Sequence, residues 1–365
     1  MKLYIIAGEA SGDLHGSNLI RAFKKKRPEV ECRAWGGDLM QAAGADLVKH
    51  YRDLAFMGFV EVLRNLRTIL GNIAFCKRDI LDYRPDALIL IDYPGFNLRI
   101  AKWAKEQGIR VIYYISPQVW AWHTSRVRAI RRDVDKMLVI LPFEQNFYRE
   151  HGLDAEFVGQ PLLDAIGERP AAKPLLERPK HITLLPGSRR QEVQRILPAM
   201  LEATRSFDDY EFTVAAATSL PESFYQSFTH GFPKVKVLSG RTYDLLDRSR
   251  AALVKSGTST LETALLGVPQ VVCYAGNPVS YMIARRLVNV RYISLVNLIV
   301  DAPLVRELIQ HDLTPANLVQ ALSEILDPEQ ARKMEVEYAR LRERLGGGGA
   351  SEKAAAAILR VMEGK

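Results

Sequence analysis

The chain contains the segment His181-Ile-Thr-Leu-Leu-Pro-Gly-Ser-Arg-Arg190, in which a short apolar strand leads through a tight Gly/Ser loop into a helix. A second segment of the same kind is Ala252-Leu-Val-Lys-Ser-Gly-Thr-Ser-Thr-Leu-Glu262. The start of a helix presents free backbone N–H groups at the positive end of the helix dipole. Two such segments in one half of the chain predict an α/β region that binds a phosphorylated ligand.

Apolar runs alternate with amphipathic stretches in both halves of the chain. The runs that we interpret as strands are Lys2–Ala7, Ala87–Ile91, Arg110–Ile115, Lys136–Leu141, His181–Leu185, Glu211–Ala216, Lys234–Leu238, Ala251–Val254 and Gln270–Cys273. Continuous apolar strands separated by helices are typical of parallel sheets that are covered on both faces. The pattern pauses at the proline-containing segment Asp164–Lys180, which we interpret as a linker.

The fold class predicted from this pattern is α/β, with two Rossmann-like, doubly wound domains. We expect the first domain at residues 1–165, the second at 175–340, and a helical tail at 341–365, with helices from Asp301 onward. In such sheets ligands bind at the carboxyl ends of the strands, so we expect the site in a cleft between the two halves.

The composition is that of a globular protein with a basic surplus. Of its 365 residues 48% are apolar, which suffices for two cores, and the formal net charge is +8. This surplus favours an anionic partner, although it also fits mere solubility. The three cysteines form no C-x-x-C pattern, so neither a disulfide framework nor a zinc site is indicated.

No targeting, membrane-spanning or nucleic-acid-binding signature is evident. The apolar run at the start is too short for a signal peptide, and no stretch reaches the roughly 18 apolar residues of a spanning helix. RNP, zinc-finger and helix-turn-helix signatures are missing, so nucleic acid is not an expected partner. We expect a cytoplasmic location that still allows contact with a membrane surface.

The loop Gly8-Glu-Ala-Ser-Gly-Asp-Leu-His-Gly16 follows the first strand and is the first candidate ligand site. It matches neither the G-x-S-x-G elbow nor the Walker A loop. The candidate residues in it are Glu9, Ser11, Gly12, Asp13 and His15. The alternative is an ordinary strand-to-helix turn in which Ser11 or Asp13 caps the helix.

Asp92 directly follows the strand Ala87–Ile91. A carboxylate at the carboxyl end of a parallel strand points toward the ligand site, where it could act as a general base on a substrate hydroxyl. The alternative is a cap for the following helix.

In the second half, the two Gly/Ser loops supply the candidate phosphate ligands. These are Gly187, Ser188 and Arg189 in the first loop and Ser256, Gly257, Thr258 and Ser259 in the second. Glu262 lies one turn into the helix, a spacing that suits the hydroxyls of a ribose. Ser259 and Glu262 also have the spacing of a capping box, and the two interpretations are compatible.

The segment 57–75 is strongly amphipathic. Its apolar side includes Phe59, Val60, Leu63, Leu66, Ile69 and Leu70. Such a face either packs on the protein core or lies on a bilayer surface.

Asp133-Val-Asp135 has the form of a metal-binding D-x-D motif, which we interpret as a chance match, so no metal is expected.

Taken together, these segments resemble the lipid-A-disaccharide synthases of Gram-negative bacteria. The matching pieces are Gly8–Asp13, Met57–Leu63, Ile91–Asn97, Ser116–Trp122, Leu141–Phe147, Leu184–Arg189, Ser256–Glu262 and Ser294–Leu298, in order along nearly the whole chain. Tyr93 and Gly95 depart from the residues expected after Asp92 without disturbing its role.

The resemblance implies a GT-B-type glycosyltransferase that needs neither a metal nor another cofactor. It implies inverting transfer of 2,3-diacylglucosamine from UDP-2,3-diacylglucosamine to the 6-hydroxyl of 2,3-diacylglucosamine 1-phosphate (lipid X). It also implies that Asp92, Glu9 and Arg189 occupy essential positions and that Asn297 belongs to the active-site segment. Glu9 and His15 are assigned no proton-transfer step.

The same resemblance implies a peripheral protein on the cytoplasmic side of the inner membrane, with the apolar face of Phe59–Ile73 as its membrane contact. The basic surplus of the chain would complement anionic lipid headgroups. It further implies a homodimer with swapped C-terminal parts. Two rivals stay open at this point: another UDP-sugar enzyme, such as an epimerase or a peptidoglycan-type glycosyltransferase, and a non-enzymatic basic scaffold that binds membranes.

Overall fold

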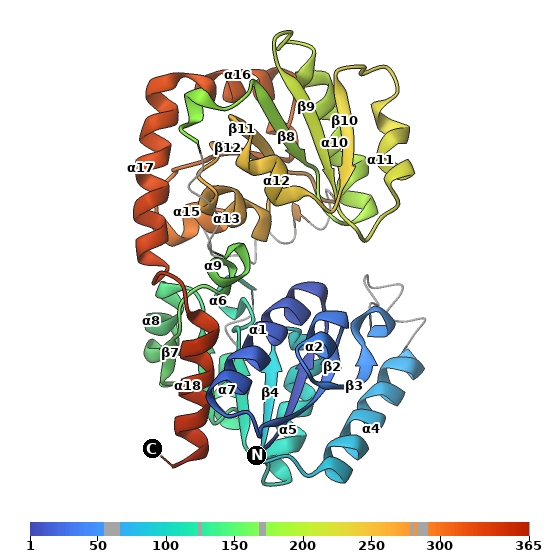
Figure 1. Ribbon diagram of the computed structural model, residues 1–365, viewed down its shortest axis with the longest axis vertical. Helices are drawn as coiled ribbons and strands as arrows, with labels where there is room; N and C mark the ends of the chain where they lie inside the picture. Colours follow the sequence, from blue (N-terminus) through green and yellow to red (C-terminus); the bar gives the residue numbers. More distant parts are fainter. Residues whose placement is uncertain (55–65, 123–125, 168–172, 278–280, 283–290, 365) are drawn as a thin grey trace. The chain divides into compact units, whose positions relative to one another are not determined.

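A computed structural model describes residues 1–54, 66–122, 126–167, 173–277, 281–282 and 291–364. The chain divides into two compact units (Figure 1). Unit 1 comprises Met1–Gly167 together with Leu345–Lys365, and unit 2 comprises Glu168–Arg344. Each unit is built on its own parallel sheet.

The described strands of unit 1 form a seven-stranded sheet in the order β3-β2-β1-β4-β5-β6-β7. They are β1 (Lys2–Ala7), β2 (Glu31–Gly36), β3 (Asp46–His50), β4 (Ala87–Ile91), β5 (Val111–Tyr114), β6 (Lys136–Val139) and β7 (Ala155–Phe157). All neighbours pair in parallel, with Ala7 of β1 opposite Ile91 of β4. The loops that follow β1 and β4 therefore emerge side by side at one edge of the sheet.

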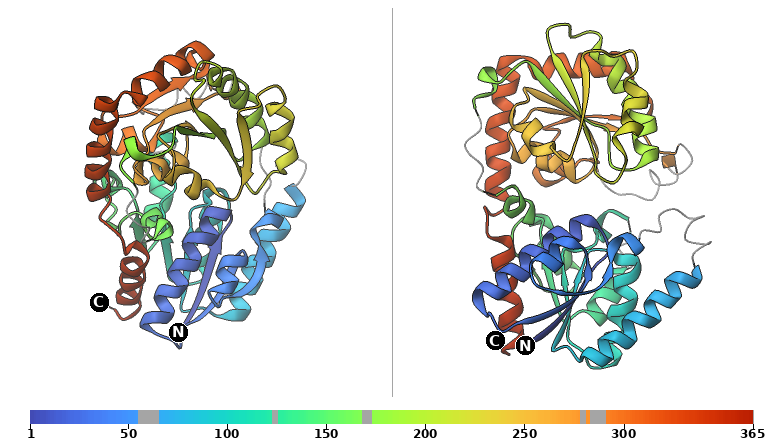
Figure 2. Two further views of the ribbon diagram at one scale, coloured as in Figure 1. Left: turned by 45° about the horizontal axis from the view of Figure 1, so that its top comes forward. Right: turned by 45° about the vertical axis from the view of Figure 1, so that its right-hand side comes forward.

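Helices cover both faces of this sheet (Figure 2). They are α1 (Ala10–Lys26), α2 (Asp38–Ala42), η1 (Tyr51–Leu54), α4 (Leu66–Tyr83), α5 (Pro94–Glu106), α6 (Val119–Trp122), α7 (Arg126–Asp133), α8 (Pro142–Glu150), α9 (Pro161–Ile166) and α18 (Ala350–Met362). One core contains α1 and α18, and the other contains α4, α5 and α7. Alternate strand residues enter the two cores, so Tyr113 and Tyr114 of β5 lie on opposite faces.

Unit 2 repeats this architecture with a six-stranded sheet in the order β10-β9-β8-β11-β12-β13. Its strands are β8 (His181–Leu185), β9 (Glu211–Ala216), β10 (Val235–Ser239), β11 (Ala251–Lys255), β12 (Gln270–Tyr274) and β13 (Arg306–Ile309). Its helices are η2 (Leu175–Glu177), α10 (Arg190–Thr204), α11 (Glu222–Thr229), α12 (Thr242–Asp247), α13 (Thr258–Leu265), α15 (Leu295–Val300), η3 (Gln310–Asp312), α16 (Pro315–Leu326) and α17 (Pro328–Arg344). β8 and β11 pair in parallel, with Leu185 opposite Val254.

These two parallel sheets confirm the predicted fold class. The prediction of helices from Asp301 onward is wrong at β13, a short edge strand. The glycine run 346–349 separates α17, which belongs to unit 2, from α18, which packs on α1 in unit 1. Helix α1 also begins at Ala10, not at Gly16 as its apolar pattern predicts.

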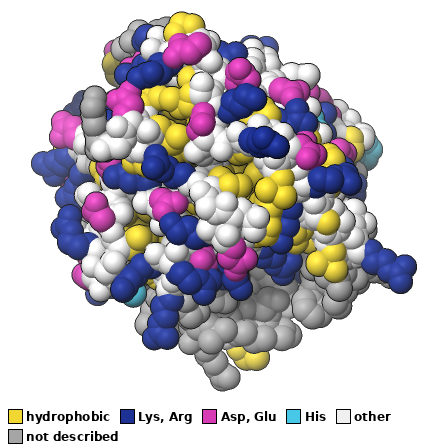
Figure 3. All heavy atoms as spheres, turned by 90° about the horizontal axis from the view of Figure 1, so that it is seen from below, with side chains coloured by type: hydrophobic (Ala, Val, Ile, Leu, Met, Phe, Trp, Pro, Cys, Tyr) yellow, Lys and Arg dark blue, Asp and Glu magenta, His cyan; other side chains and the backbone are white. Residues whose placement is uncertain are grey.

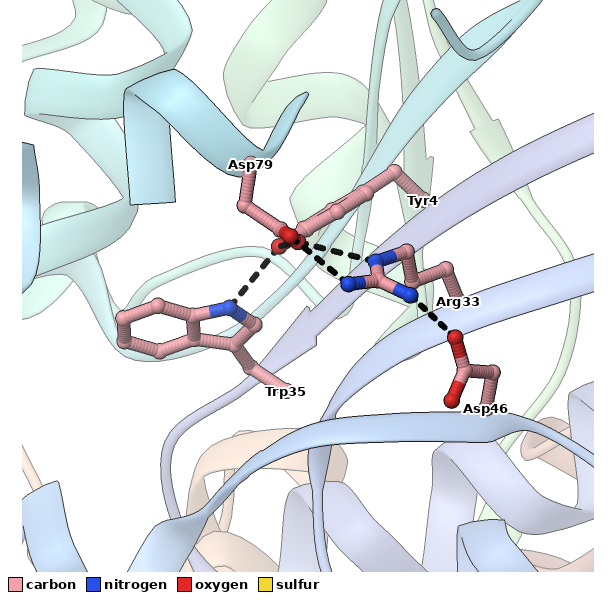
Figure 4. Close-up of polar contacts among 5 residues, drawn as sticks. All are labelled: Tyr4, Arg33, Trp35, Asp46 and Asp79. Atoms are coloured by element: carbon pink, nitrogen blue, oxygen red, sulfur yellow. Dashed lines mark hydrogen bonds and ion pairs between the residues drawn. The ribbon is translucent and has the colours of Figure 1, made fainter. Parts of the chain in front are cut away.

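Strand β2 shows why a sequence pattern can hide a strand. Its central residue is Arg33, whose guanidinium donates to both carboxylate oxygens of Asp79 on α4, at 3.0 and 2.7 Å, and also pairs with Asp46 (Figure 4). Tyr4 donates a 2.6 Å hydrogen bond to Asp79, and the Trp35 indole donates to Tyr4. This polar network attaches α4 to the sheet through charges that a search for apolar runs does not detect.

Candidate active site

The loop between β1 and α1 comes close to the loop after β4. A Cβ atom on Gly8 would lie 2.3 Å from the ring of Tyr93, so only glycine allows this approach. Glu9 is the N-cap residue of α1 in an extended conformation, and its side chain makes no capping hydrogen bond. Its carboxylate therefore does not cap the start of this helix.

Asp13 is engaged inside unit 1. Its carboxylate accepts hydrogen bonds from the backbone N–H groups of Gly37, Leu39 and Met40, at 2.8, 3.1 and 3.0 Å, and its side chain is buried. These groups belong to the start of α2, so Asp13 caps that helix from a neighbouring one. Ser11, in contrast, is exposed, and Gly12 is buried against Ala7.

His15 is a buried neutral imidazole. Burial lowers its pKa to about 4, although the negative charge of Asp164 acts in the opposite direction. Asp164 itself accepts hydrogen bonds from the backbone N–H groups of Gly349 and Ser351, both at 2.7 Å, and so caps α18. The structure thus places His15 beside the attachment of the C-terminal helix.

Asp92 lies at the carboxyl end of β4 in a left-handed backbone conformation, with φ of 45°. Burial raises its pKa to about 6, and the negative charge of Glu9 adds to this effect. A partly buried carboxylate beside a second acid titrates close to neutral pH, which is the range that suits a general base.

A third acid near this edge, Glu144, was not identified from the sequence. It lies fully inside unit 1, where it accepts hydrogen bonds from the Trp120 indole and from the backbone N–H groups of Ile140 and Leu141, at 3.0–3.2 Å. Burial raises its pKa to about 7, and Asp92 contributes in the same direction. The Leu-Pro-Phe-Glu order, with Pro first and Glu third in the helix, was the available signal.

In unit 2, the two Gly/Ser loops are joined by an ion pair. Gly187 adopts a positive φ of 114°, and its loop leads into α10 with Arg189 at the N-cap position. Glu192 of α10 accepts a 2.9 Å contact from Lys255, the last residue of β11, and lies 3.7 Å from Arg189. Lys255 thus adds a cation between the loops that the sequence analysis did not single out.

The second loop leads into α13, with Gly257 at the N-cap position. Ser256 donates a 3.0 Å hydrogen bond to the carbonyl of Ile293. Glu262 accepts a 2.8 Å hydrogen bond from Tyr243, and burial raises its pKa while Tyr243 and Ser259 act in the opposite direction. Thr258 is exposed at the helix start, whereas Ser188 offers its carbonyl to Ser219 at 2.9 Å.

Asn297 is buried and makes hydrogen bonds within unit 2. Its amide donates to the carbonyl of Val305 and to Glu307, at 2.8 and 2.9 Å, and its oxygen accepts from the N–H of Val305. Glu307 also accepts from the backbone N–H groups of Ile293 and Ser294. Asn297 therefore supports the segment whose carbonyl holds Ser256.

Only part of the predicted membrane face lies within the described residues. Phe59, Val60 and Leu63 lie outside them, as does the side chain of Leu66. On α4, Ile69 is partly buried, whereas Leu70 is 54% exposed and Phe75 is 36% exposed. Among the described helices, none has the length and apolar character needed to cross a membrane.

The D-x-D motif is occupied by ion pairs. Asp133 is paired with Arg132 at 2.6 Å, and Asp135 pairs with Lys105 and accepts from the N–H of Val111. Within the described ranges, no group of three or more His, Cys, Asp or Glu side chains is arranged to hold a metal ion.

The comparison with solved structures identifies the fold. Solved structures share this fold: the S. aureus MnaA–UDP co-structure superimposes with a TM-score of 0.70 at 13% identity, covering 99% of this chain and 97% of that one. The kitacinnamycin glycotransferase superimposes with a TM-score of 0.65 at 16% identity, covering 99% of both chains. The chain thus has the GT-B fold.

The sequence comparisons give the family. Residues 3–361 match the model of the family described as lipid-A-disaccharide synthetase. The lipid-A-disaccharide synthase of Syntrophus aciditrophicus is 42% identical over 372 residues, covering 98% of this chain and 97% of the relative. That of Geobacter metallireducens is 40% identical over 373 residues, covering 99% and 97%. The chain belongs to the lipid-A-disaccharide synthetase family, a family of glycosyltransferases, which confirms the resemblance stated from the sequence.

Proposed function

We propose that this protein transfers 2,3-diacylglucosamine from UDP-2,3-diacylglucosamine to the 6-hydroxyl of 2,3-diacylglucosamine 1-phosphate. The products are UDP and the β(1→6)-linked disaccharide 1-phosphate of lipid A biosynthesis. Family membership and the names of the relatives support this reaction. The single structural observation that carries it is Asp92, a partly buried acid with a pKa of about 6 at the carboxyl end of β4.

In this proposal Asp92 is the general base. At neutral pH its carboxylate is deprotonated and accepts the proton of the acceptor 6-hydroxyl. The hydroxyl oxygen forms a bond to the anomeric carbon of the donor as the bond from that carbon to the UDP oxygen breaks. Attack from the face opposite the leaving group inverts the configuration. Burial raises the pKa of this base, and the negative charge of Glu9 beside it adds to the effect.

The UDP moiety is assigned to unit 2. The free N–H groups at the starts of α10 and α13 suit the diphosphate, with Gly187 and Ser188 in one loop and Ser256–Ser259 in the other. Arg189 and Lys255 supply positive charge for the leaving group. We assign Glu262 to the ribose hydroxyls, and its hydrogen bond from Tyr243 supports this assignment by fixing the carboxylate.

We further propose that the protein works as a peripheral protein on the cytoplasmic side of the inner membrane. The exposed Leu70 and Phe75 on α4 support an apolar contact with lipid. Lys and Arg side chains are abundant on the face of the molecule shown in Figure 3, which fits a surface of anionic lipids. A homodimer follows from the family resemblance alone, and light scattering of the purified protein tests it.

The reaction is tested by measuring UDP release from detergent-dispersed UDP-2,3-diacylglucosamine, with and without lipid X, in the presence of EDTA. We expect release that requires lipid X and persists with EDTA. Release without lipid X would replace the proposal with a hydrolase or another acceptor. No release from a protein that still binds UDP would discard the acceptor assignment and keep the nucleotide half.

A further inference from the structure

The turn after β4 holds two consecutive residues in an unfavourable backbone conformation. Asp92 and Tyr93 have φ values of 45° and 48°, in the left-handed region that residues other than glycine avoid. Such a conformation persists only where the surrounding contacts enforce it, and it is concentrated at functional sites. The question is therefore which side chains enforce it here.

Two buried side chains converge on the backbone carbonyl of Asp92. The Tyr113 hydroxyl of β5 donates a 2.6 Å hydrogen bond to this oxygen, and the Asn97 amide of α5 donates one of 2.7 Å. Both side chains are fully buried, and the Asn97 amide also reaches the carbonyl of Ile91 at 3.2 Å. The same carbonyl is thus fixed from a neighbouring strand and from the following helix.

Additional contacts hold the turn from its other sides. The N–H of Asn97 donates to the carbonyl of Tyr93 at 3.0 Å, which makes Tyr93 the N-cap residue of α5. The ring of Tyr93 fills the space that Gly8 leaves open. Rotation of the Asp92 peptide would break both hydrogen bonds to its carbonyl and displace this ring.

We propose that Tyr113 and Asn97 are positioning residues, which fix the Asp92 carbonyl and thereby hold the Asp92 carboxylate in the orientation from which it accepts the proton of the sugar hydroxyl. The inference deepens the proposed function and rests on the role of Asp92 as the base. Neither residue contacts the substrate in this scheme.

The charged groups around the carboxylate give the inference a measurable consequence. Asp92 is faced by Glu9 from the β1–α1 loop and by Glu144 from α8, while Arg126 of α7 acts on Tyr113. A carboxylate that loses its fixed orientation turns toward solvent and away from these acids. Its pKa then moves down toward the ordinary value, which shifts the acidic limb of the kcat profile to lower pH.

Tyr113→Phe tests the inference, and Tyr114→Phe is its matched control. Both are buried tyrosines on β5, but Tyr114 faces the opposite core and its hydroxyl makes no hydrogen bond to the Asp92 turn. Losing one hydrogen bond to the turn should lower kcat of Tyr113→Phe roughly 3- to 10-fold, with KM for both substrates nearly unchanged. The acidic limb should shift to lower pH, and Tyr114→Phe should behave like the parent enzyme.

Asn97→Ala provides a second, independent variant. Because its amide shares one acceptor with Tyr113, the loss of kcat in the double variant should differ from the product of the single losses. Thermal melts of all variants show whether a loss merely follows the folded fraction. Rates are compared below the melting transition of the least stable variant.

The inference is overturned if Tyr113→Phe keeps the parent kcat and pH profile. Equal losses in Tyr113→Phe and Tyr114→Phe, or losses that match the unfolded fraction, would also overturn it. Asp92→Asn is measured alongside: if it retains turnover, the proposed base is wrong, whichever way the tyrosine variants behave. Should Tyr113→Phe not fold, the kcat profile of Asn97→Ala decides in the same way.

Discussion

The described sheets of the two units share one strand order, apart from the additional edge strand β7 in unit 1, but their corresponding loops carry opposite chemistry. Each sheet begins at a central strand, β1 or β8, whose neighbour is β4 or β11. The loops after β1 and β4 carry carboxylates, Glu9 and Asp92. The loops after β8 and β11 carry glycines and are joined by the ion pair of Glu192 with Lys255, next to Arg189. One scaffold thus offers a place for a base and a place for phosphates.

The loops of the two units suit different parts of the proposed reaction. Burial and the negative charge of Glu9 raise the pKa of Asp92, which prepares the carboxylate to take a proton. Helix starts with nearby cations suit the charge that develops on a leaving diphosphate. In the proposed reaction, chemistry at the loops, and not the sheet itself, decides which substrate each unit binds.

The largest effect is expected from removing the proposed base from unit 1. Asp92→Ala should lose roughly 10²- to 10⁴-fold in kcat, because a general base typically contributes that much. UDP binding, measured by isothermal titration calorimetry, should be unchanged because unit 2 retains its loops. A folded Asp92→Ala protein with near-normal turnover would remove Asp92 from the mechanism.

Removing the cations from unit 2 should weaken nucleotide binding. Arg189→Ala should weaken UDP binding roughly 10- to 100-fold, the range of a lost charge-assisted hydrogen bond. Lys255→Ala should do the same to a smaller extent, since Lys255 is partly neutralised by Glu192. Arg205→Ala is the matched control, because Arg205 is an exposed arginine of unit 2 that pairs with Glu202. If Arg189→Ala and Arg205→Ala bind UDP equally well, the diphosphate is not held at the α10 loop.

Each unit also has an exposed leucine on its surface. Leu70 on α4 of unit 1 is 54% exposed, and Leu238 at the end of β10 in unit 2 is 38% exposed. Leu70→Ser should lower the fraction that sediments with anionic vesicles several-fold, because an apolar side chain inserted in lipid contributes about 1–3 kcal/mol. Leu238→Ser should leave it unchanged. Equal sedimentation of the two variants would show that this part of α4 does not meet lipid.

The sequence predicted those parts of the fold that bury continuous apolar runs. Strands β1, β4, β8 and β9 were placed residue for residue because both of their faces lie in a core. Strands β2 and β3 were missed, since β2 carries Arg33 in its centre and β3 is an edge strand with no buried residue. Their polar groups find partners, such as Asp79, far along the chain.

The residues of the candidate site were likewise predicted only in part. Asp92 and Arg189 could be proposed because each follows a predictable strand, whereas the role of Glu9 was implied by the family resemblance. The hydrogen bonds from Tyr113 and Asn97 to the Asp92 carbonyl could not be predicted, because they depend on a left-handed turn and on the register of β4 with β5. Asn297 was carried over by resemblance, and only its contacts with Val305 and Glu307 reveal how it acts on the loop around Ser256.

The smallest expected effect is on the melting temperature and its dependence on pH. The folded-state pKa of Asp92, about 6, lies above its ordinary value of 3.8. Its contribution to stability is therefore full below the unfolded pKa and is lost as the pH rises through about 6. Asp92→Asn, which does not titrate, should melt a few degrees higher than the parent at about pH 8 and at nearly the same temperature at about pH 4.

Asp209 in unit 2 supplies the opposite sign. Its exposed carboxylate pairs with Lys180, which lowers its pKa, so its contribution is present at neutral pH and lost as the solution becomes acidic. Asp209→Asn should therefore gain no stability at about pH 8. The change in melting temperature caused by each substitution could instead show the same pH dependence. In that case the destabilising effect of the Asp92 charge would not come from the surroundings of Asp92. A higher melting temperature at about pH 8 for Asp92→Asn alone would mean that the charged Asp92 carboxylate destabilises unit 1. In unit 2, the charged Asp209 carboxylate would instead be stabilised by its ion pair with Lys180.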